Sequence, residues 1–161
     1  KGIYPLEFTT RFGYPHISIA MEGITSEWGA FLHALASQEP FDLKVKRGFQ
    51  VGVVVAVPPF PFQDLQSFKR YSEEAVILFK KPNHEGVHLG DVKLDDRDWK
   101  LAGQSGYALV LTGSGSTVEA ARKHAYTRVE NIMIPNMFYR PDIGTRWYSE
   151  SDKLQTWGYL Y

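Results

Sequence analysis

The sequence has no cysteine, no excess of charge of either sign and no long hydrophobic run. Without cysteine there is no disulfide framework and no thiolate metal site, a composition typical of a cytoplasmic protein. The 18 basic side chains equal the 18 acidic ones, so no overall field favours nucleic acid or anionic lipid. The longest apolar run, Val51–Phe62, contains three prolines and is shorter than the roughly 20 residues that a membrane span needs. We therefore expect neither nucleic acid nor a membrane as a partner.

What is present is ordinary for a folded protein: 43% apolar and 22% charged residues in a chain of 161. This length suffices for one domain with its own core, or for one domain plus part of a neighbour. The chain opens on Lys1-Gly2 without an initiator methionine and enters an apolar segment at once. This beginning predicts a segment taken from a longer polypeptide.

The first forty residues predict one strand and two short helices. Ile3–Thr10 alternates in the manner of a strand, with Leu6 and Phe8 on one face, and Gly13 ends it. Helices are predicted over 17–21 and 26–36, because apolar residues there recur at helical spacing.

From residue 41 the pattern changes to strands and one long helix. Strands are predicted over 44–57, 74–79, 86–92, 107–112 and 138–139. The helix is predicted over 117–134, with Ser116 and Glu119 as a capping box and Pro135 as its end. The aromatic residues that close the tail 149–161 predict that it docks, either on the domain's own core, as we favour, or in a subunit or interdomain contact. This order predicts an α+β fold with two parts, residues 1–40 and 41–161.

Three local motifs have alternative interpretations. The segment Thr112–Thr117 resembles a phosphate-binding loop, although a glycine turn that leads into a helix cap is favoured. The spacing of His84 and His88 is compatible with a metal site, but a turn separates them and no acidic or thiolate companion is evident. Pro58–Phe62 is either a polyproline-type ligand or, as we favour, a kinked strand end.

Two blocks of sequence resemble the phosphoribosylamine–glycine ligase family of the ATP-grasp superfamily. The segment LEFTTRFGYP at residues 6–15 is similar to the family's EFNVRFGDPE, and residues 106–146 resemble its closing pattern of a strand, a turn, a helix and MxYRRDIGxR. This resemblance implies the last strand and helices of an ATP-grasp domain in 1–40. It implies for 41–161 a mixed-sheet C-terminal domain closed by one long helix.

The resemblance also implies a site in the first block. The family activates a carboxylate with ATP and magnesium, and an amine then attacks the acyl phosphate. Carried over residue by residue, the magnesium ligands would be Glu7 and Thr9. Arg11 would neutralise phosphate charge as a catalytic residue and would also contact substrate, and the other substrate-binding residues would be Gly13, Tyr14 and His16.

The first block also departs from the family pattern. Thr9 stands where the family has asparagine, and Tyr14 and His16 stand where it has aspartate and glutamate. These departures imply either a different substrate or lost activity. The nucleotide-binding lysines and the glycine loop would lie in upstream ATP-grasp domains of the same polypeptide, so we expect the chain alone not to be a competent ligase. The alternative is a non-catalytic binding or interaction domain that retains the family scaffold.

Overall fold

The computed structural model describes residues 4–159, and it confirms the α+β class. Its centre is a four-stranded sheet in the order β3-β6-β1-β8. The long strands β1 (Phe49–Ala56) and β6 (Tyr107–Gly115) lie in the middle, and the short strands β3 (Val87–Leu89) and β8 (Phe138–Tyr139) lie at the edges. All strand pairs within residues 4–159 are antiparallel.

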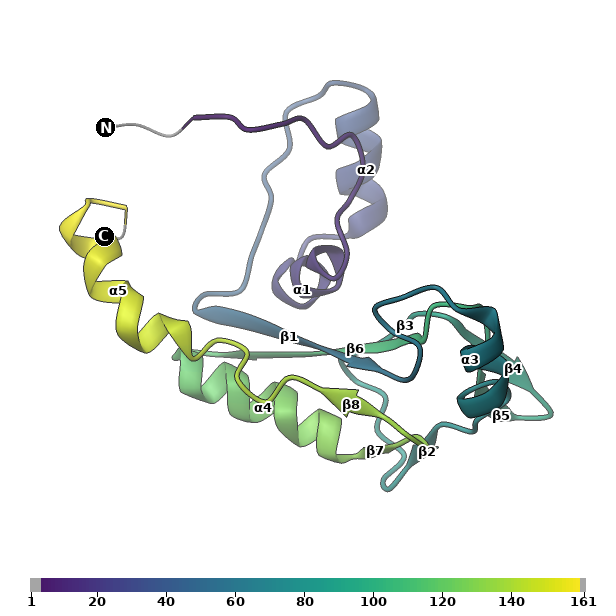
Figure 1. The fold of residues 1–161 in the computed structure, drawn as a ribbon. Coiled ribbons are helices and arrows are strands. Elements are labelled where there is room, and N and C mark those ends of the chain that lie inside the picture. The colour runs from purple at the N-terminus through teal and green to yellow at the C-terminus, as the bar shows by residue number, and fades with distance from the viewer. Residues whose placement is uncertain (1–3, 160–161) are drawn as a thin grey trace.

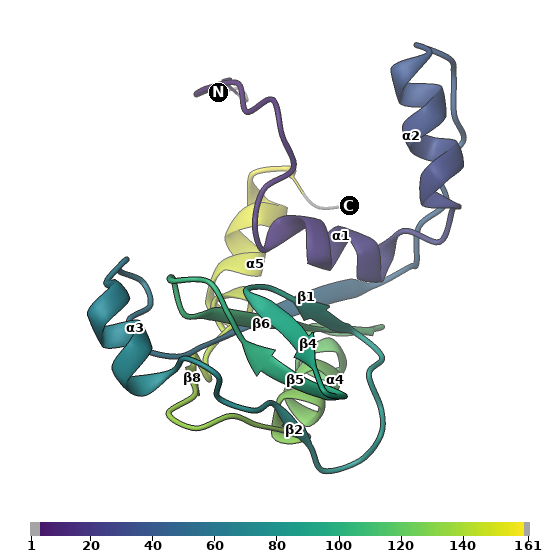
Figure 2. The same cartoon turned by 90° about the vertical axis from the view of Figure 1, so that its right-hand side faces the viewer.

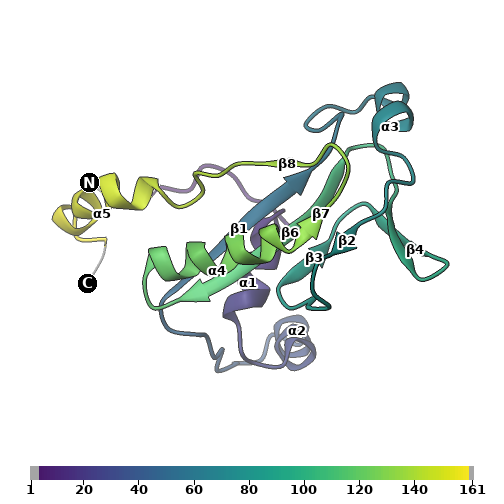
Figure 3. The same cartoon turned by 90° about the horizontal axis from the view of Figure 1, so that it is seen from below.

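Two helices cover opposite faces of this sheet (Figures 1 and 3). Helix α4 (Val118–Glu130) runs along β6 and β1 on one face, and α1 (His16–Gly23) lies on the other. The sheet and its two helices thus form three layers, and the main core lies between the sheet and α4.

The core is built from the valine-rich stretch that the sequence predicts as a buried strand. Alternate β1 residues, Val53 and Val55 among them, are fully buried against the apolar side of α4, which contributes Ala121, Ala125 and Val129. These three recur at spacings of four, as one helix face requires. The predicted strand begins later than expected, at Phe49 rather than Lys44.

The smaller elements surround one end of the sheet (Figure 2). Helix α3 (Leu65–Tyr71) follows the proline-rich turn after β1. A hairpin is made by β4 (Val92–Asp95) and β5 (Asp98–Leu101), which sequence analysis missed because it expected one strand over 86–92. Strand β2 (Leu78–Phe79) pairs with β7 (Ile132–Met133). The strand expected over 74–79 is therefore reduced to its last two residues and one isolated bridge at Val76.

The strand predicted over Ile3–Thr10 does not form in residues 4–10, and Ile3 itself lies outside the described residues. Leu6 is 98% exposed and Phe8 is 95% exposed. A strand forms only where a neighbour accepts and donates its backbone hydrogen bonds. In the described part of the chain nothing pairs with residues 4–10. Residues 4–10 thus show the apolar–polar alternation of a strand but have no neighbouring strand to pair with in the described part of the chain.

Helix α2 (Trp28–Ala36) stands away from the sheet, next to the N-terminal segment (Figure 1). It is held by aromatic contacts: Phe12 packs edge-on against Trp28, Trp28 against Phe31, and Phe31 lies against Phe41. Leu32 and Leu35 remain on its exposed side. The predicted helices over 17–21 and 26–36 are both confirmed, with small shifts at their ends.

The chain ends in α5 (Arg146–Thr156), an exposed helix in which no residue between 146 and 156 is buried. Trp157 and Tyr159 follow it, and they are 60% and 46% exposed. The favoured interpretation, packing on the domain's own core, is therefore wrong for these two residues, and a subunit or interdomain contact stays a prediction. Leu160 and Tyr161 lie outside the described residues. Among residues 4–159, no helix has both the length and the apolar character to cross a bilayer.

The N-terminal cap of the long helix lies one residue later than predicted. The N-cap of α4 is Thr117, whose side-chain oxygen accepts a hydrogen bond from the backbone N–H of Ala120 at 3.2 Å, while the helix ends at Glu130 before β7. The capping box that begins at Ser116 is thus wrong, because Ser116 lies before the cap. We expect Thr117→Ala to lower the free energy of unfolding by about 1 kcal/mol. Ser116→Ala is the matched control and should leave the denaturant midpoint unchanged, and equal effects of the two would contradict this assignment.

Candidate functional site

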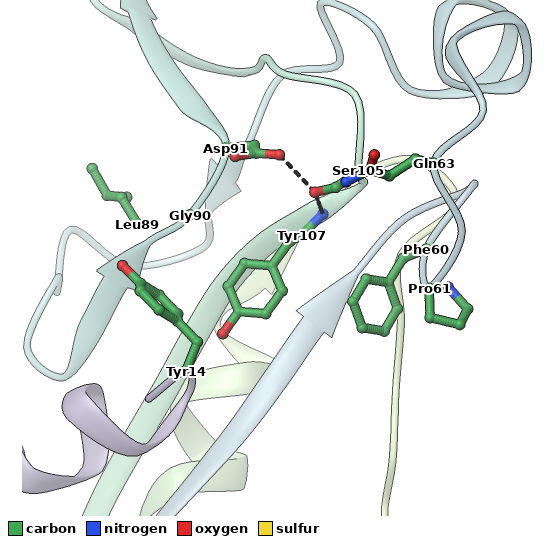
Figure 4. A pocket seen from close by; sticks show the side chains of 9 residues that line it. All are labelled: Tyr14, Phe60, Pro61, Gln63, Leu89, Gly90, Asp91, Ser105 and Tyr107. Atoms are coloured by element: carbon green, nitrogen blue, oxygen red, sulfur yellow. Dashed lines mark hydrogen bonds between the residues drawn. The ribbon is translucent and has the colours of Figure 1, made fainter. Parts of the chain in front are cut away.

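A pocket of about 400 Å³ lies where the segment before α1 meets the sheet and the turn after β1 (Figure 4). Three aromatic rings form its walls. Tyr14 precedes α1, Phe60 lies in the turn after β1, and Tyr107 begins β6. Tyr107 packs edge-on against Tyr14 at 5.7 Å between ring centroids and lies 6.0 Å from Phe60. The other lining residues are Pro61, Gln63, Leu89, Gly90, Asp91 and Ser105.

A short chain of hydrogen bonds fixes the polar side of the pocket. The Ser105 hydroxyl donates to the Asp91 carboxylate at 2.6 Å and accepts from the backbone N–H of Tyr107 at 3.1 Å. The backbone of Asp91 is also held, because its N–H donates to the Tyr107 carbonyl and its carbonyl accepts from Ala102. Asp91 is therefore held at the pocket, with one carboxylate oxygen bound to Ser105.

The hydroxyl of Tyr107 is buried and has no hydrogen-bond partner within the described residues. Burial and the neighbouring Tyr14 raise the pKa of Tyr107 to about 12, so its phenol is neutral at physiological pH. A buried hydroxyl without a partner costs free energy, and such groups in native proteins are often completed by a water or a ligand.

Of the six predicted site residues, three lie at or next to the pocket and three lie on the exposed N-terminal segment. Tyr14 lines the pocket, with Gly13 immediately before it and His16 at the exposed start of α1. The Gly13 carbonyl accepts the N–H of Ile17 and so helps to start that helix. The other three, Glu7, Thr9 and Arg11, lie on the exposed extended segment, where Arg11 donates to the Phe12 carbonyl at 3.0 Å.

Within residues 4–159, the predicted ligands are not part of a preformed metal site. Glu7 and Thr9 offer one carboxylate and one hydroxyl, which would hold Mg²⁺ only together with waters and phosphate oxygens. In the described part of the chain, no three His, Cys, Asp or Glu side chains gather closely enough to hold a metal ion. The two histidines His84 and His88 are engaged elsewhere, since His84 packs on Phe79 and His88 lies 3.2 Å from the Thr112 hydroxyl.

A buried ionic cluster holds α1, and with it Tyr14, against the sheet. Glu22 of α1 is 9% exposed and accepts hydrogen bonds from Thr112 at 2.9 Å and Ser114 at 3.0 Å, both on β6. Arg128 of α4 donates to Glu22 at 3.1 Å, and Lys46 donates at 3.0 Å. The carboxylate of Glu22 on α1 therefore binds β6 and α4 directly. It also binds Lys46, in the loop before β1.

This cluster predicts a loss of stability in acid. Burial alone would raise the pKa of Glu22, but hydrogen bonds from Lys46, Thr112 and Ser114, with the charge of Arg128, lower it from 4.5 to about 2. The stabilisation is therefore complete above about pH 4.5 and disappears as the pH falls toward 2. Urea unfolding at a series of pH values should show a steeper loss in this window for the wild type than for Glu22→Gln. Equal slopes would contradict the assignment.

Sequence reasoning missed the pocket residues Asp91, Ser105 and Tyr107, and also Glu22. The signal available was weak: Asp91 and Ser105 lie beside glycines at strand ends, where polar residues usually mark turns. Two of the motif interpretations are settled. Residues 112–117 lead into a helix cap, as favoured, but without the expected glycine turn, because residues up to Gly115 belong to β6 and the cap is Thr117. Pro58–Pro61 form a turn at the end of β1.

Comparison with known proteins identifies the fold and the family. Residues 50–146, more than half of the chain, match the family model "Phosphoribosylglycinamide synthetase, C domain". The chain belongs to this family. The match covers β1 to the start of α5, including the sheet, α4 and most of the pocket lining.

Relatives of the phosphoribosylglycinamide synthetase C-domain family match over a longer stretch. The phosphoribosylamine–glycine ligase of Mycobacterium tuberculosis is 31% identical over 150 residues, which cover 91% of this chain and 33% of the relative. The ligase of Listeria monocytogenes is 29% identical over 152 residues, covering 91% and 34%. The crystal structure of the Thermotoga maritima ligase superposes with a TM-score of 0.62 at 25% identity, covering 86% of this chain and 33% of that one. The chain thus spans about a third of the length of these relatives, and its resemblance to the family is confirmed.

Proposed function

We propose that this chain is the C-terminal part of an ATP-dependent carboxylate–amine ligase of the phosphoribosylamine–glycine ligase type. The observation that carries the proposal is the contact between the two blocks: Tyr14 of the first packs on Tyr107 of the second and shares a pocket with it. The ligases of Mycobacterium and Listeria match over 91% of the chain. On this proposal the protein acts in the cytoplasm, in purine biosynthesis.

The division into residues 1–40 and 41–161 is part of this proposal. The exposed alternation of Leu6 and Phe8 suits a strand that pairs with a sheet formed by the remaining two thirds of the ligase length. The exposed Leu32 and Leu35 of α2 suit the same neighbour. Residues 1–40 would then complete the catalytic ATP-grasp domain, and residues 41–161 would form the C-terminal domain.

The exposed segment would carry the charged part of the site. Glu7 would supply one magnesium ligand and Thr9 a weaker one, because a hydroxyl is a poorer ligand than a carboxylate. The guanidinium of Arg11, whose other N–H groups have no hydrogen-bond partner among residues 4–159, would neutralise phosphate charge. Magnesium, when bound with ATP, would supply charge neutralisation at the phosphates. Gly13, Tyr14 and His16 would contact substrate.

The proposal is tested by phosphate release from ATP in the complete protein that contains this chain. We expect release to require ATP, magnesium, a carboxylate substrate and an amine substrate together, with glycine and phosphoribosylamine in the panel. Glu7→Gln removes a charged ligand and should lower the rate by at least about tenfold. Glu39→Gln is the matched control on the exposed loop after α2 and should keep the rate. No turnover with any pair would favour the non-catalytic alternative.

A further inference from the structure

We propose that the pocket between Tyr14, Phe60 and Tyr107 binds a small organic ammonium group, with Asp91 as its counter-ion. No relative's name assigns such a site, and an ammonium site here does not require the ligase activity proposed above. The proposal rests on the rings and the carboxylate that line this pocket.

The three rings supply the apolar part of a cation site. Tyr107 lies between the other two, with its centroid 5.7 Å from Tyr14 and 6.0 Å from Phe60, and Figure 4 shows the three side chains coming from separate segments. The faces of aromatic rings carry negative quadrupole potential and attract cations within about 6 Å. Alkyl groups next to the nitrogen would also gain contact with these rings.

The charge of the pocket selects a cation. Asp91 is the one residue with a formal charge among the nine that line it. Asp91 accepts from Ser105 through one oxygen, Oδ2, and its other oxygen has no recorded donor within residues 4–159. A carboxylate acceptor without any basic neighbour repels phosphates and carboxylates and attracts N⁺–H donors. The same side chain is held by Ser105, so its position is set before a ligand arrives.

The hydroxyl of Tyr107 is buried and lies at the end of the ring that is turned away from Asp91 (Figure 4). It lacks a partner among the described residues, and the exposed Tyr14 ring packs edge-on against its ring. A modest rotation of Tyr14, which is 66% exposed, would open this hydroxyl to the pocket. An ammonium group bound to Asp91 would therefore contact the Tyr107 ring, while the hydroxyl lies at the other end of that ring (Figure 4).

The test uses two probes of nearly equal size and different charge, n-butylammonium and n-butanol, added to the 161-residue chain at constant ionic strength. Backbone amide resonances are followed by NMR. We expect n-butylammonium to shift the resonances of Tyr14, Asp91 and Tyr107 saturably, with a Kd in the range of about 1–10 mM. Binding of n-butanol should be about tenfold weaker, because a charge-assisted hydrogen bond and the cation–π attraction are absent.

Two variants locate the site. Asp91→Asn keeps an oxygen that accepts from Ser105 and should weaken n-butylammonium about tenfold. Asp152→Asn makes the same change of charge on the exposed helix α5 and should leave binding unchanged. If Asp91→Asn does not fold, the comparison of the two probes on the wild type decides. Equal binding of both probes, or no saturable shift below about 100 mM, would overturn the proposal.

Discussion

Glu22→Ala should lower the free energy of unfolding by about 3–5 kcal/mol, one of the largest effects of any single substitution in this chain. The carboxylate is buried between α1 and β6, and it accepts from four side chains on three separate segments, the loop before β1, β6 and α4. Its removal leaves the guanidinium of Arg128, which is 7% exposed, with one fewer anionic partner. Breaking a buried ion pair by removing one member is costly because the other charge stays buried.

Urea unfolding of Glu22→Ala and of Glu39→Ala measures this effect. Glu39 is an exposed glutamate after α2, and it takes part in no ion pair within residues 4–159, so its removal should change stability by less than about 0.5 kcal/mol. Similar, small effects for both variants would mean that Glu22 does not hold α1 to the sheet.

Gly113→Ala should be the other strongly destabilising change, by about 2–3 kcal/mol. Gly113 lies on β6 directly under α4, and a Cβ there would lie 2.4 Å from the backbone nitrogen of Ala125 and 2.9 Å from the carbonyl oxygen of Ala121. Because both contacts are with backbone, no side-chain rotation relieves them and the helix must move away from the sheet. Such overpacking typically costs about 1–3 kcal/mol, and the buried core between α4 and β1 would loosen as well.

The matched control is Gly29→Ala in α2, where an added Cβ meets nothing within 4 Å. Alanine stabilises a helix interior relative to glycine by about 0.5–1 kcal/mol, so this variant should be unchanged or slightly more stable. Thermal unfolding of both proteins, followed by circular dichroism, compares them. A Gly113→Ala protein as stable as the wild type would show that α4 does not approach β6 as closely as described.

The core of the fold could be predicted because its residues obey simple periodicities. Val53 and Val55 alternate along β1, and Ala121, Ala125 and Val129 follow the period of a helix. The strand predicted at the N-terminus does not form, because periodicity is only one of the conditions for a strand. Leu6 and Phe8 show the right alternation, but a strand also needs a partner, and periodicity carries no information about partners.

The candidate site could be predicted only in part. Tyr14 was found through a motif, because the resemblance marks residues 6–15 as a block. Asp91 and Tyr107 come together only through the pairing of β3 and β6 and the path of the chain after β3, and neither is visible in local spacing. The cluster of Glu22 and Arg128 joins residues 106 positions apart, a separation at which one sequence gives no signal.

Calorimetric titration of ATP with magnesium tests most directly the central claim, that this chain is a part of a ligase whose nucleotide-holding segments lie elsewhere. The 161-residue chain should show no binding tighter than about 1 mM, because Glu7, Thr9 and Arg11 alone do not enclose the phosphates. The complete protein that contains the chain should bind in the micromolar range under the same conditions. Micromolar binding by the 161-residue chain alone would contradict the account.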